Sequence, residues 1–347
     1  MASATSTGTG KGTGEGEGSE SESELIVLTC ASGRQCTQII PLLYGKSSLR
    51  LVVNSEKSRA QLAEQYPDTQ VVRANLQVPQ ECADVVDGAT TVFYVGPPFH
   101  PYEVTLGMNM VDAAVAESRR RRQQQDSNGS DSDDVSPSKP SAVHFVFSSA
   151  LHPEASKLLH HDQKRQIEEY LVESGLSYTI LQPSTFMDNF IGQLLGQKDS
   201  SSGEPGTFMA PFNPSVPMSF SAVRDHAEVA VKVVRERARH FFATYQLVST
   251  LPITTTEYVE SISAVMGKRF DIKRTPFEQA AEMFVKMTYG VDKADDVDQS
   301  FRDAPEHMLL YYNKRGLLGN PGVLEWLLGR KPTTPAELAR LKLKEAE

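Results

Sequence analysis

Two polar residues near the middle of the chain, His160 and Lys164, are of types that do acid–base chemistry. His160 and Lys164 are four positions apart, a spacing that places two side chains on the same face of a helix. Lys164 also aligns with Ile167 and Leu171 on an apolar stripe, so we expect its side chain to face the interior. A histidine can give or take a proton near neutral pH, because its ordinary pKa is about 6.5.

Each of these residues also has an interpretation without chemistry. Lys164 would then be a snorkelling side chain, whose stem covers apolar surface while its amine reaches water. His160 would be a residue at the start of a helix and nothing more. His160, His161 and Asp162 together do not predict a metal site, because adjacent residues point to different faces of a helix and no distant third ligand is evident.

A second candidate site lies in a short turn near the start of the chain. The segment from Leu28 to Cys36, LTCASGRQC, joins an expected strand to an expected helix. Such a turn can hold a pyrophosphate, because free amides and the helix dipole attract anions while glycines let the backbone approach. Gly33 is present, whereas Cys30 and Cys36 occupy the two positions where further glycines are expected. We expect both side chains to obstruct the phosphates, and Pro41 to kink or shorten the helix.

These residues need a scaffold, and the chain alternates short apolar runs with longer amphipathic segments. Runs that are apolar on both faces and separated by helices are typical of a parallel sheet covered on both sides. The predicted fold class is therefore α/β, a doubly wound parallel sheet. The expected strands are 25–28, 49–53, 70–72, 91–95, 144–147 and 178–181, and the expected helices are 34–44, 56–65, 79–86, 103–117 and 161–174.

The predicted organisation has a tail, a sheet domain and a smaller lobe. Residues 1–24 are rich in Gly, Ser, Thr and Glu, which predicts a disordered tail. The sheet domain covers 25–183 and is interrupted by a polar insertion, 118–141, which we also expect to be disordered. Residues 184–347 form a smaller, mostly helical substrate lobe, interleaved with the sheet domain. Its expected helices are 225–239, 255–266, 276–288 and 304–313.

Composition and charge disfavour several classes of protein. The chain has 347 residues and a net charge of −9, without the clustered basic face that nucleic-acid binding needs. No stretch approaches about 18 consecutive apolar residues, and the first residues do not have the pattern of a secretory signal. The three cysteines without a C-x-x-C motif suit a reducing compartment. We therefore expect a cytoplasmic protein without a membrane span, with Arg119 to Arg122 as a nuclear address in the alternative.

Several segments together resemble the NmrA-like branch of the atypical short-chain dehydrogenase/reductases, from about Leu25 to Lys331. The first turn is similar to that family's T-G-A-T-G-x-x-G, and the longest agreement follows the pattern H-F-D-x-K to M-E-N-F. The segments that carry the resemblance are TCASG (29–33), ANL (74–76), FYVGPP (93–98), HHDQKRQIEEYLVESGLSYTILQPSTFMDNF (160–190), AVRD (222–225) and YNKRGLLGNPGVLEWLLGRKPTT (312–334).

The resemblance implies a Rossmann fold that binds NAD(P), with a small lobe closing a substrate pocket. The broader superfamily uses a serine, a tyrosine and a lysine, with the tyrosine four residues before the lysine. The resemblance therefore implies Ser148 and Lys164 as catalytic residues, with His160 in place of the tyrosine. The implied cofactor-binding residues are Thr29, Ala31, Ser32, Gly33, Arg34, Gln35, Asn54, Asn75, Pro97 and Lys164. Substrate contacts are expected at the carboxyl edge of the sheet, where ligands of this fold bind. The candidates are Phe99, Thr185, Phe186 and Met187.

The choice of cofactor depends on the end of the second strand. An acidic residue there would accept the ribose hydroxyls of NAD, whereas a basic one would favour the 2′-phosphate of NADP. The segment Val53-Asn54-Ser55 contains no acid, and Arg34, Lys57 and Arg59 could supply positive charge. We therefore expect NADP, with NAD as the alternative.

Four functions remain in competition at this stage. The first is an NADP(H)-dependent oxidoreductase acting on a small carbonyl or quinone compound. The second is a non-catalytic NAD(P)-sensing regulator with a protein partner, which the missing tyrosine and the altered turn favour. The third is a redox-neutral isomerase or dehydratase that uses His160 or Lys164 on a small molecule. In the fourth, Cys30 and Cys36 form a redox thiol pair that controls cofactor binding.

Overall fold

The computed structural model describes residues 24–128, 141–197, 204–289 and 297–345. Within these residues, seven parallel strands form the main sheet in the order β10-β6-β5-β4-β1-β2-β3. Because consecutive strands are joined by helical crossovers, all strands end at the same edge of the sheet. The strands are β1 (Leu25–Leu28), β2 (Ser48–Val53), β3 (Gln70–Arg73), β4 (Thr91–Val95), β5 (His144–Ser148), β6 (Ser177–Pro183) and β10 (Ala243–Leu247).

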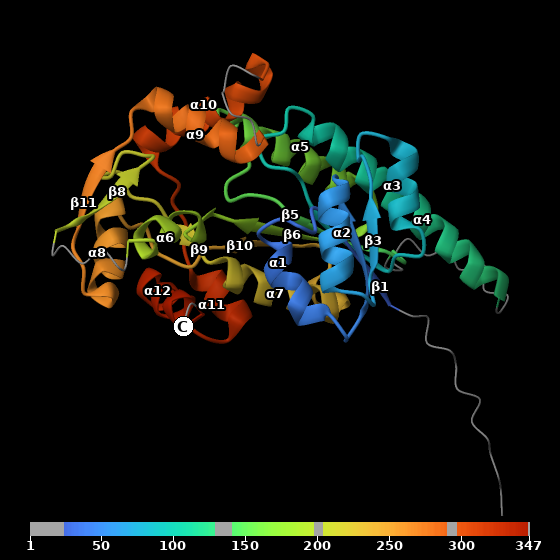
Figure 1. Ribbon diagram of the computed structural model, residues 1–347. Coiled ribbons are helices and arrows are strands. Elements are labelled where there is room, and N and C mark those ends of the chain that lie inside the picture. The colour runs from blue at the N-terminus through green and yellow to red at the C-terminus, as the bar shows by residue number, and fades with distance from the viewer. Residues whose placement is uncertain (1–23, 129–140, 198–203, 290–296, 346–347) are drawn as a thin grey trace, which may run out of the picture.

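Helices cover both faces of this sheet (Figure 1). On one face lie α1 (Cys36–Leu43), α2 (Glu56–Gln65), α7 (Val223–Glu236) and α11 (Gly322–Leu328), and on the other lie α3 (Pro79–Val86), α4 (Glu103–Asn128) and α5 (Leu159–Glu173). Successive strand residues point to opposite faces, so Ile26 joins the core under α1 and Val27 joins the core under α3. The predicted doubly wound parallel sheet is confirmed.

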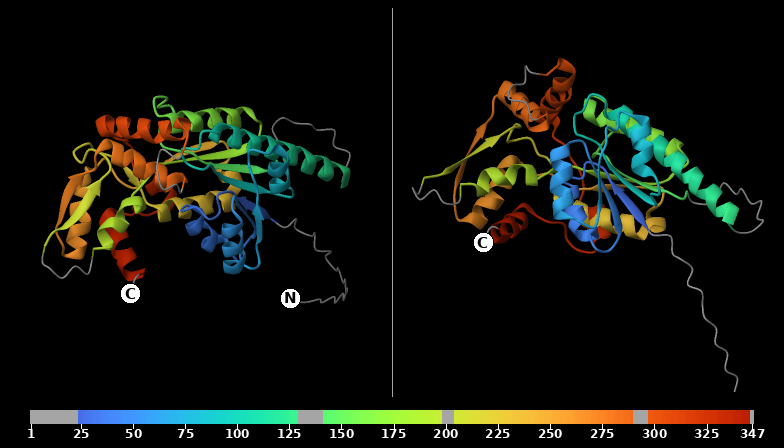
Figure 2. Two further views of the ribbon diagram at one scale, coloured as in Figure 1. Left: turned by 45° about the horizontal axis from the view of Figure 1, so that its top comes forward. Right: turned by 45° about the vertical axis from the view of Figure 1, so that its right-hand side comes forward.

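The rest of the chain packs beyond the carboxyl edge of the sheet (Figure 1, Figure 2). Two small parallel sheets, β8 with β11 and β7 with β9, share a third apolar core with the surrounding helices. Helix α10 also packs against α5 and so connects this region to the main sheet. The elements are β7 (Thr185–Phe186), α6 (Asp188–Leu195), β8 (Gly206–Ala210), β9 (Phe220–Ser221), α8 (Thr255–Met266), β11 (Phe270–Arg274), α9 (Phe277–Tyr289), α10 (Gln299–Arg315) and α12 (Pro335–Glu345). The 3-10 helix η1 (Arg237–His240) instead precedes the start of β10, at the opposite edge of the main sheet.

Two of the differences from the sequence-based expectation concern the main sheet and the helices that cover it. Helix α4 continues to Asn128 instead of ending at 117, so the expected disordered insertion begins within a helix. Arginine and glutamine favour helices, and the Glu117–Arg120 ion pair links successive turns. The carboxyl half also contributes strand β10, whose mixed sequence ATYQL gives little signal because it lies at a half-buried sheet edge. Residues 129–140 of the insertion and 1–23 of the expected tail lie outside the described residues.

Candidate functional site

The turn between β1 and α1 is fixed to the carboxyl edge of the sheet. The buried Thr29 hydroxyl donates to the Val95 carbonyl at 2.9 Å and accepts from the Val95 amide at 2.8 Å. The Ala31 amide donates to the carbonyl of Val52 at 3.0 Å. These bonds join the turn to the ends of β4 and β2, so Thr29 holds the site in place and its hydroxyl is already engaged.

The turn has the features that a pyrophosphate needs. The amides of Ser32, Arg34 and Gln35 donate to no backbone carbonyl within the described part of the chain, and they lie just before helix α1. Open amides at a helix N-terminus bind anions. A Cβ on Gly33 would lie 2.9 Å from the Cys30 carbonyl oxygen, so only glycine fits there without a shift. The turn therefore fits the pyrophosphate of a dinucleotide.

The two cysteines of the turn occupy different environments. Cys36 is fully buried, and its thiol donates to the Thr29 carbonyl at 3.3 Å, so the expectation that it obstructs the phosphates is wrong. Cys30 is half-buried and has a φ of +48°, in the left-handed region that favours glycine. Burial raises the pKa of Cys30 to about 12 and raises the pKa of Cys36 as well. Because the reactive form is the thiolate, the redox-pair hypothesis loses support.

Lys164 faces inward, as predicted, and forms an ion pair that the sequence did not reveal. Its Nζ donates to Glu103 Oε1 at 2.6 Å and lies 5.6 Å from the centroid of the Phe147 ring. Burial raises the pKa of the Glu103 carboxyl, and the Lys164 ammonium opposes this rise. Glu103 begins helix α4, shortly after the end of β4. The pair therefore lies where the two covering helices α4 and α5 meet the carboxyl edge of the sheet.

His160 is buried one turn before Lys164 on helix α5. Its ring packs against Phe99 with centroids 4.8 Å apart, and its Nδ1 has no hydrogen-bond partner within the described residues. Burial, followed by His161 and Lys164, lowers the pKa of His160 well below the usual value. Burial therefore disfavours the protonated, charged form of this ring. A histidine with a lowered pKa is a weak proton acceptor and a poor candidate for an imidazolium donor.

His161 has a different role from its neighbour. Its Nδ1 lies 3.0 Å from the carbonyl oxygen of His152 and its Nε2 lies 3.2 Å from the hydroxyl of Tyr312 on α10. Burial lowers the pKa of His161 to about 4. The two histidine rings are nearly perpendicular, with an interplanar angle of 87°. His161 thus connects α5 to α10, whereas His160 faces the loop after β4.

Ser148 lies at the end of β5 but does not bond to the other members of the candidate set. Its hydroxyl donates to Gln35 Oε1 at 2.7 Å and lies 3.4 Å from His226 Nε2. Gln35 immediately precedes helix α1. Ser148 therefore supports the pyrophosphate turn, while His160 and Lys164 form a separate group with Phe99 and Glu103.

The remaining predicted cofactor residues lie at the ends of three strands. Asn54 follows β2 and is exposed, and the Oδ1 of the exposed Asn75, after β3, accepts from the Gln77 amide at 3.1 Å. Pro97 follows β4 and is half-buried. All three lie at the edge where the turn after β1 also ends, because the strands are parallel.

The predicted substrate residues divide into core and site. Met187 is fully buried in the third core, and its carbonyl accepts from the Tyr258 hydroxyl at 2.9 Å, so a substrate contact by its side chain is not supported. Thr185 and Phe186 are half-buried on β7. Phe99 is half-buried at a φ of +62°, and its carbonyl accepts from the Tyr289 hydroxyl at 2.6 Å. This bond joins the loop after β4 to helix α9.

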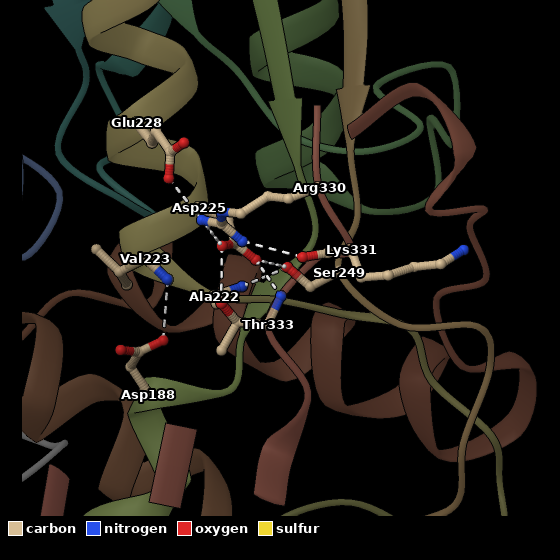
Figure 3. A network of polar contacts seen from close by, with 9 residues as sticks. All are labelled: Asp188, Ala222, Val223, Asp225, Glu228, Ser249, Arg330, Lys331 and Thr333. Atoms are coloured by element: carbon tan, nitrogen blue, oxygen red, sulfur yellow. Dashed lines mark hydrogen bonds and ion pairs between the residues drawn. The ribbon is translucent and has the colours of Figure 1, made fainter. Parts of the chain in front are cut away.

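Two segments that carried the family resemblance meet in one polar network (Figure 3). The fully buried carboxylate of Asp225 accepts from the amide and hydroxyl of Thr333, at 2.7 and 2.8 Å. It also accepts from Ser249 Oγ at 3.0 Å and from Arg330 Nη2 at 2.9 Å. The Ser249 hydroxyl in turn accepts from the Ala222 amide. These interactions connect the segment before α12 to the start of α7.

The sequence of the chain matches a known protein family. A profile of the NmrA-like family matches residues 138–334, more than half of the chain. The chain belongs to the NmrA-like family. A second profile, described as NAD(P)H-binding, matches residues 30–206 and includes the turn after β1. The family resemblance and the NAD(P)-binding fold predicted from the sequence are confirmed.

Individual relatives of this NmrA-like chain have different names. Quinone oxidoreductase 2 of Escherichia coli K12 is 24% identical over 205 residues, which cover 58% of this chain and 66% of the relative, just under two thirds of its length. Citrobacter sp. triphenylmethane reductase, solved with NADP(H), is 19% identical with a TM-score of 0.67, covering 91% of this chain and 99% of that one. NmrA, a negative transcriptional regulator solved with NAD, is 15% identical with a TM-score of 0.68, covering 94% and 98%. These structural similarities establish the fold.

Proposed function

We propose that this NmrA-like chain is an NAD(P)H-dependent oxidoreductase that reduces a small carbonyl or quinone compound. The observation that carries the proposal is the Lys164 ammonium, which is buried at the carboxyl edge of the sheet near the pyrophosphate turn. A buried lysine amine at a ligand-binding edge is typical of a functional group, because burial of a charge is costly. The names of the E. coli quinone oxidoreductase and the Citrobacter reductase support the same class of reaction.

The residues around the turn would bind the cofactor. The amides of Ser32, Arg34 and Gln35 would hold the pyrophosphate, and Lys164 would donate to the hydroxyls of the nicotinamide ribose. When bound, the reduced nicotinamide supplies a hydride. Lys164 is also the available cation for an oxygen that becomes negative when its carbonyl carbon accepts that hydride. The neutral His160 and the Phe99 ring would line the substrate side and exclude water.

We further propose that NADP is preferred over NAD. Arg59, one of the expected cations, is paired with Glu56 at 2.5 Å, which reduces its value for a phosphate. The exposed Lys57 on α2 and Arg34 remain available. Arg73 is a further candidate, because it is paired in register with Val53 at the end of β2 and lies close enough to Glu56 to lower the pKa of that carboxyl. A basic group at this place favours a 2′-phosphate.

Calorimetric titration with NADPH and NADH tests the cofactor assignment. We expect NADPH to bind at least about tenfold more tightly, which corresponds to about 1.4 kcal/mol. Turnover of reduced cofactor with 1,4-benzoquinone and with aromatic aldehydes then tests the reaction. Binding of NADPH without turnover of any carbonyl or quinone would contradict the oxidoreductase assignment.

A second function, an NAD(P)-sensing regulator, is favoured by two departures from the superfamily pattern. His160 replaces the tyrosine and is held neutral, and Cys30 occupies a left-handed turn position instead of glycine. The structural similarity to NmrA is in line with this alternative. The regulator would bind NADP without consuming it, and a protein partner would respond to occupancy. The turnover assay therefore separates the two functions.

We propose a small-molecule substrate and a cytoplasmic location. None of the helices in the described ranges combines the length and apolar character that crossing a membrane requires. The three cysteines are free thiols, which suits a reducing compartment. Fractionation of cells that express the full chain would test the location.

A further inference from the structure

Glu103 is a buried carboxylate that the proposed mechanism has not yet used. It is the first residue of α4, its side chain is fully buried, and it lies 61 positions before its partner Lys164 in the sequence. Its Oε1 accepts from Lys164, but its buried Oε2 has no hydrogen-bond partner within the described residues. A carboxylate kept for stability alone would be expected to have both oxygens bonded. The incomplete bonding points to a functional role.

Two glycines make room for this ion pair. A Cβ on Gly107 would lie 2.6 Å from the Cδ1 of Ile167, so glycine allows helices α4 and α5 to approach each other closely. A Cβ on Gly96 would lie 2.8 Å from Glu103 Oε1 and 3.3 Å from the Tyr94 hydroxyl. Neither glycine has a positive φ, so their role is close approach and not backbone freedom. The local sequence is thus adapted to bring the Glu103 carboxylate against Lys164.

The ion pair leaves the ammonium group partly free. An ammonium group has three N–H donors, and the bond to Glu103 uses one of them. Glu103 approaches from α4 and the Phe147 ring lies near the amine, so the pair fixes the direction of the side chain. Within the described residues, Glu103 is the hydrogen-bond partner of this ammonium, so two donors remain for a ligand at the edge of the sheet.

We propose that Glu103 is a positioning residue, which holds the Lys164 ammonium in the orientation that binds the nicotinamide ribose. The inference rests on the proposed function, because it gives Lys164 a cofactor to hold. It makes the ionised form of Glu103 necessary for tight binding, since protonation would remove the charge that orients the ammonium. Cofactor affinity should then fall as pH falls through the titration of Glu103, at pH values higher than for an ordinary glutamate because burial raises this pKa.

Other titratable groups surround the pair and must be separated from it. Those with an electrostatic influence on Lys164 or Glu103, or influenced by them, are Cys30 after β1, Tyr94 on β4, His160, His161 and Glu168 on α5, and Tyr289 on α9. Burial raises the pKa of Cys30 and of Tyr289 to about 12, so both stay neutral. Burial lowers the pKa of both histidines, while it raises that of Glu168, so Glu168 is the group to control.

The test is calorimetric binding of NADP+ by the full chain as a function of pH. We expect Glu103→Gln to weaken binding about tenfold near neutral pH and to abolish the decrease at acidic pH. Glu117→Gln is the matched control, because Glu117 is also buried and ion-paired on α4, to Arg120, near the opposite end of the sheet. Glu168→Gln is a second control, because it removes the other carboxyl near Lys164 whose pKa burial raises. Glu117→Gln and Glu168→Gln should both retain the decrease in NADP+ affinity at acidic pH. If Glu168→Gln abolishes this decrease and Glu103→Gln does not, the proposal is overturned.

Two further variants keep the proposal testable if Glu103→Gln does not fold. Gly96→Ala retains both charges but displaces the carboxylate, so it should weaken NADP+ binding in the same direction by a smaller factor. If Glu103 acts through Lys164, adding Glu103→Gln to Lys164→Met should change affinity no further, and the double variant carries no unpaired charge. Additive losses, or wild-type affinity in Gly96→Ala, would overturn the proposal. These measurements need no turnover, so a failure to reduce 1,4-benzoquinone would contradict the proposed function and leave this inference standing.

Discussion

Two fully buried carboxylates, Glu103 and Asp225, each pair with a basic side chain, but their surroundings differ. Asp225 accepts four hydrogen bonds, from the Thr333 amide and hydroxyl, Ser249 and Arg330 (Figure 3). Glu103 accepts one side-chain bond, from Lys164, and its second oxygen has no partner within the described residues. A saturated carboxylate has no capacity left for a ligand and serves to hold the fold together. The unsaturated pair retains donors on Lys164, which is the condition for binding.

The largest effect on stability should come from Asp225→Ala. The change leaves the Arg330 guanidinium and the Thr333 amide without their acceptor, and we expect a loss of about 3–5 kcal/mol in the free energy of unfolding. Denaturant unfolding measures this loss. Glu228→Ala is the control, because Glu228 also pairs with Arg330 but its side chain is 48% exposed. A loss above about 1 kcal/mol in Glu228→Ala would contradict the prediction that the large effect belongs to the buried carboxylate.

Lys164→Met should instead act on function. We expect turnover of 1,4-benzoquinone to fall about 100-fold, because the substrate oxygen loses the cation that stabilises its developing charge. The steady-state rate at saturating NADPH measures this effect. Lys157→Met, at an exposed position just before α5, should retain the wild-type rate. Full turnover in Lys164→Met would contradict the functional role assigned to the Lys164–Glu103 pair.

The pH dependence of stability should reveal the junction between α5 and α10. Burial lowers the pKa of His161 to about 4, below its usual 6.5, so the unfolded chain takes up the proton first as pH falls. This group therefore contributes full stability above about pH 6.5 and loses it as pH falls toward about 4, by about 2 kcal/mol at pH 5. Denaturant unfolding at several pH values should show a shallower decrease in His161→Gln. The exposed His307→Gln on α10 is the control, and equal slopes in wild type and His161→Gln would contradict the prediction.

The smallest effect concerns the turn beside the Glu103 pair. Cys30 has a positive φ that an L side chain adopts only with strain, so Cys30→Gly should stabilise the fold by about 0.5–1 kcal/mol. Thermal denaturation of the two proteins measures the difference. Cys36→Ala, at the buried position of the same turn, should destabilise the fold. A loss of stability in Cys30→Gly would show that the thiol makes a contact worth more than the strain.

The sequence predicted most of the scaffold correctly. The apolar runs of β1 to β6 gave the strands, since residues that face a helix layer on both sides must be apolar along their whole length. The apolar stripe of α5 also gave the inward direction of Lys164. Strand β10 escaped notice because an edge strand needs no continuous apolar run. The extension of α4 escaped because its polar residues show no periodicity that separates a solvated helix from a loop.

The candidate site was only partly visible in the sequence. Spacing connected His160 with Lys164, but nothing in the local pattern connects Glu103 to a lysine 61 positions away. An acidic residue soon after the end of a central strand was the available signal. The contacts of Ser148 with Gln35 and His226 likewise join residues from separate elements. The sequence also could not predict pKa values, since the pKa of His160 is lowered by burial under segments that are distant in the chain.

The sequence by itself therefore determined the doubly wound sheet, the turn for a pyrophosphate and the NmrA-like family, because periodicity and short motifs are local properties. Tertiary structure decided which charges meet and which remain unsatisfied. The ion pair between Lys164 and Glu103 forms only because α4 and α5 approach each other closely at Gly107. The hydrogen bond from Thr333 to Asp225 forms only because the carboxyl-terminal segment returns to the start of α7. The physical reason is that ion pairing and desolvation depend on distances of a few ångströms between segments that the chain order leaves far apart.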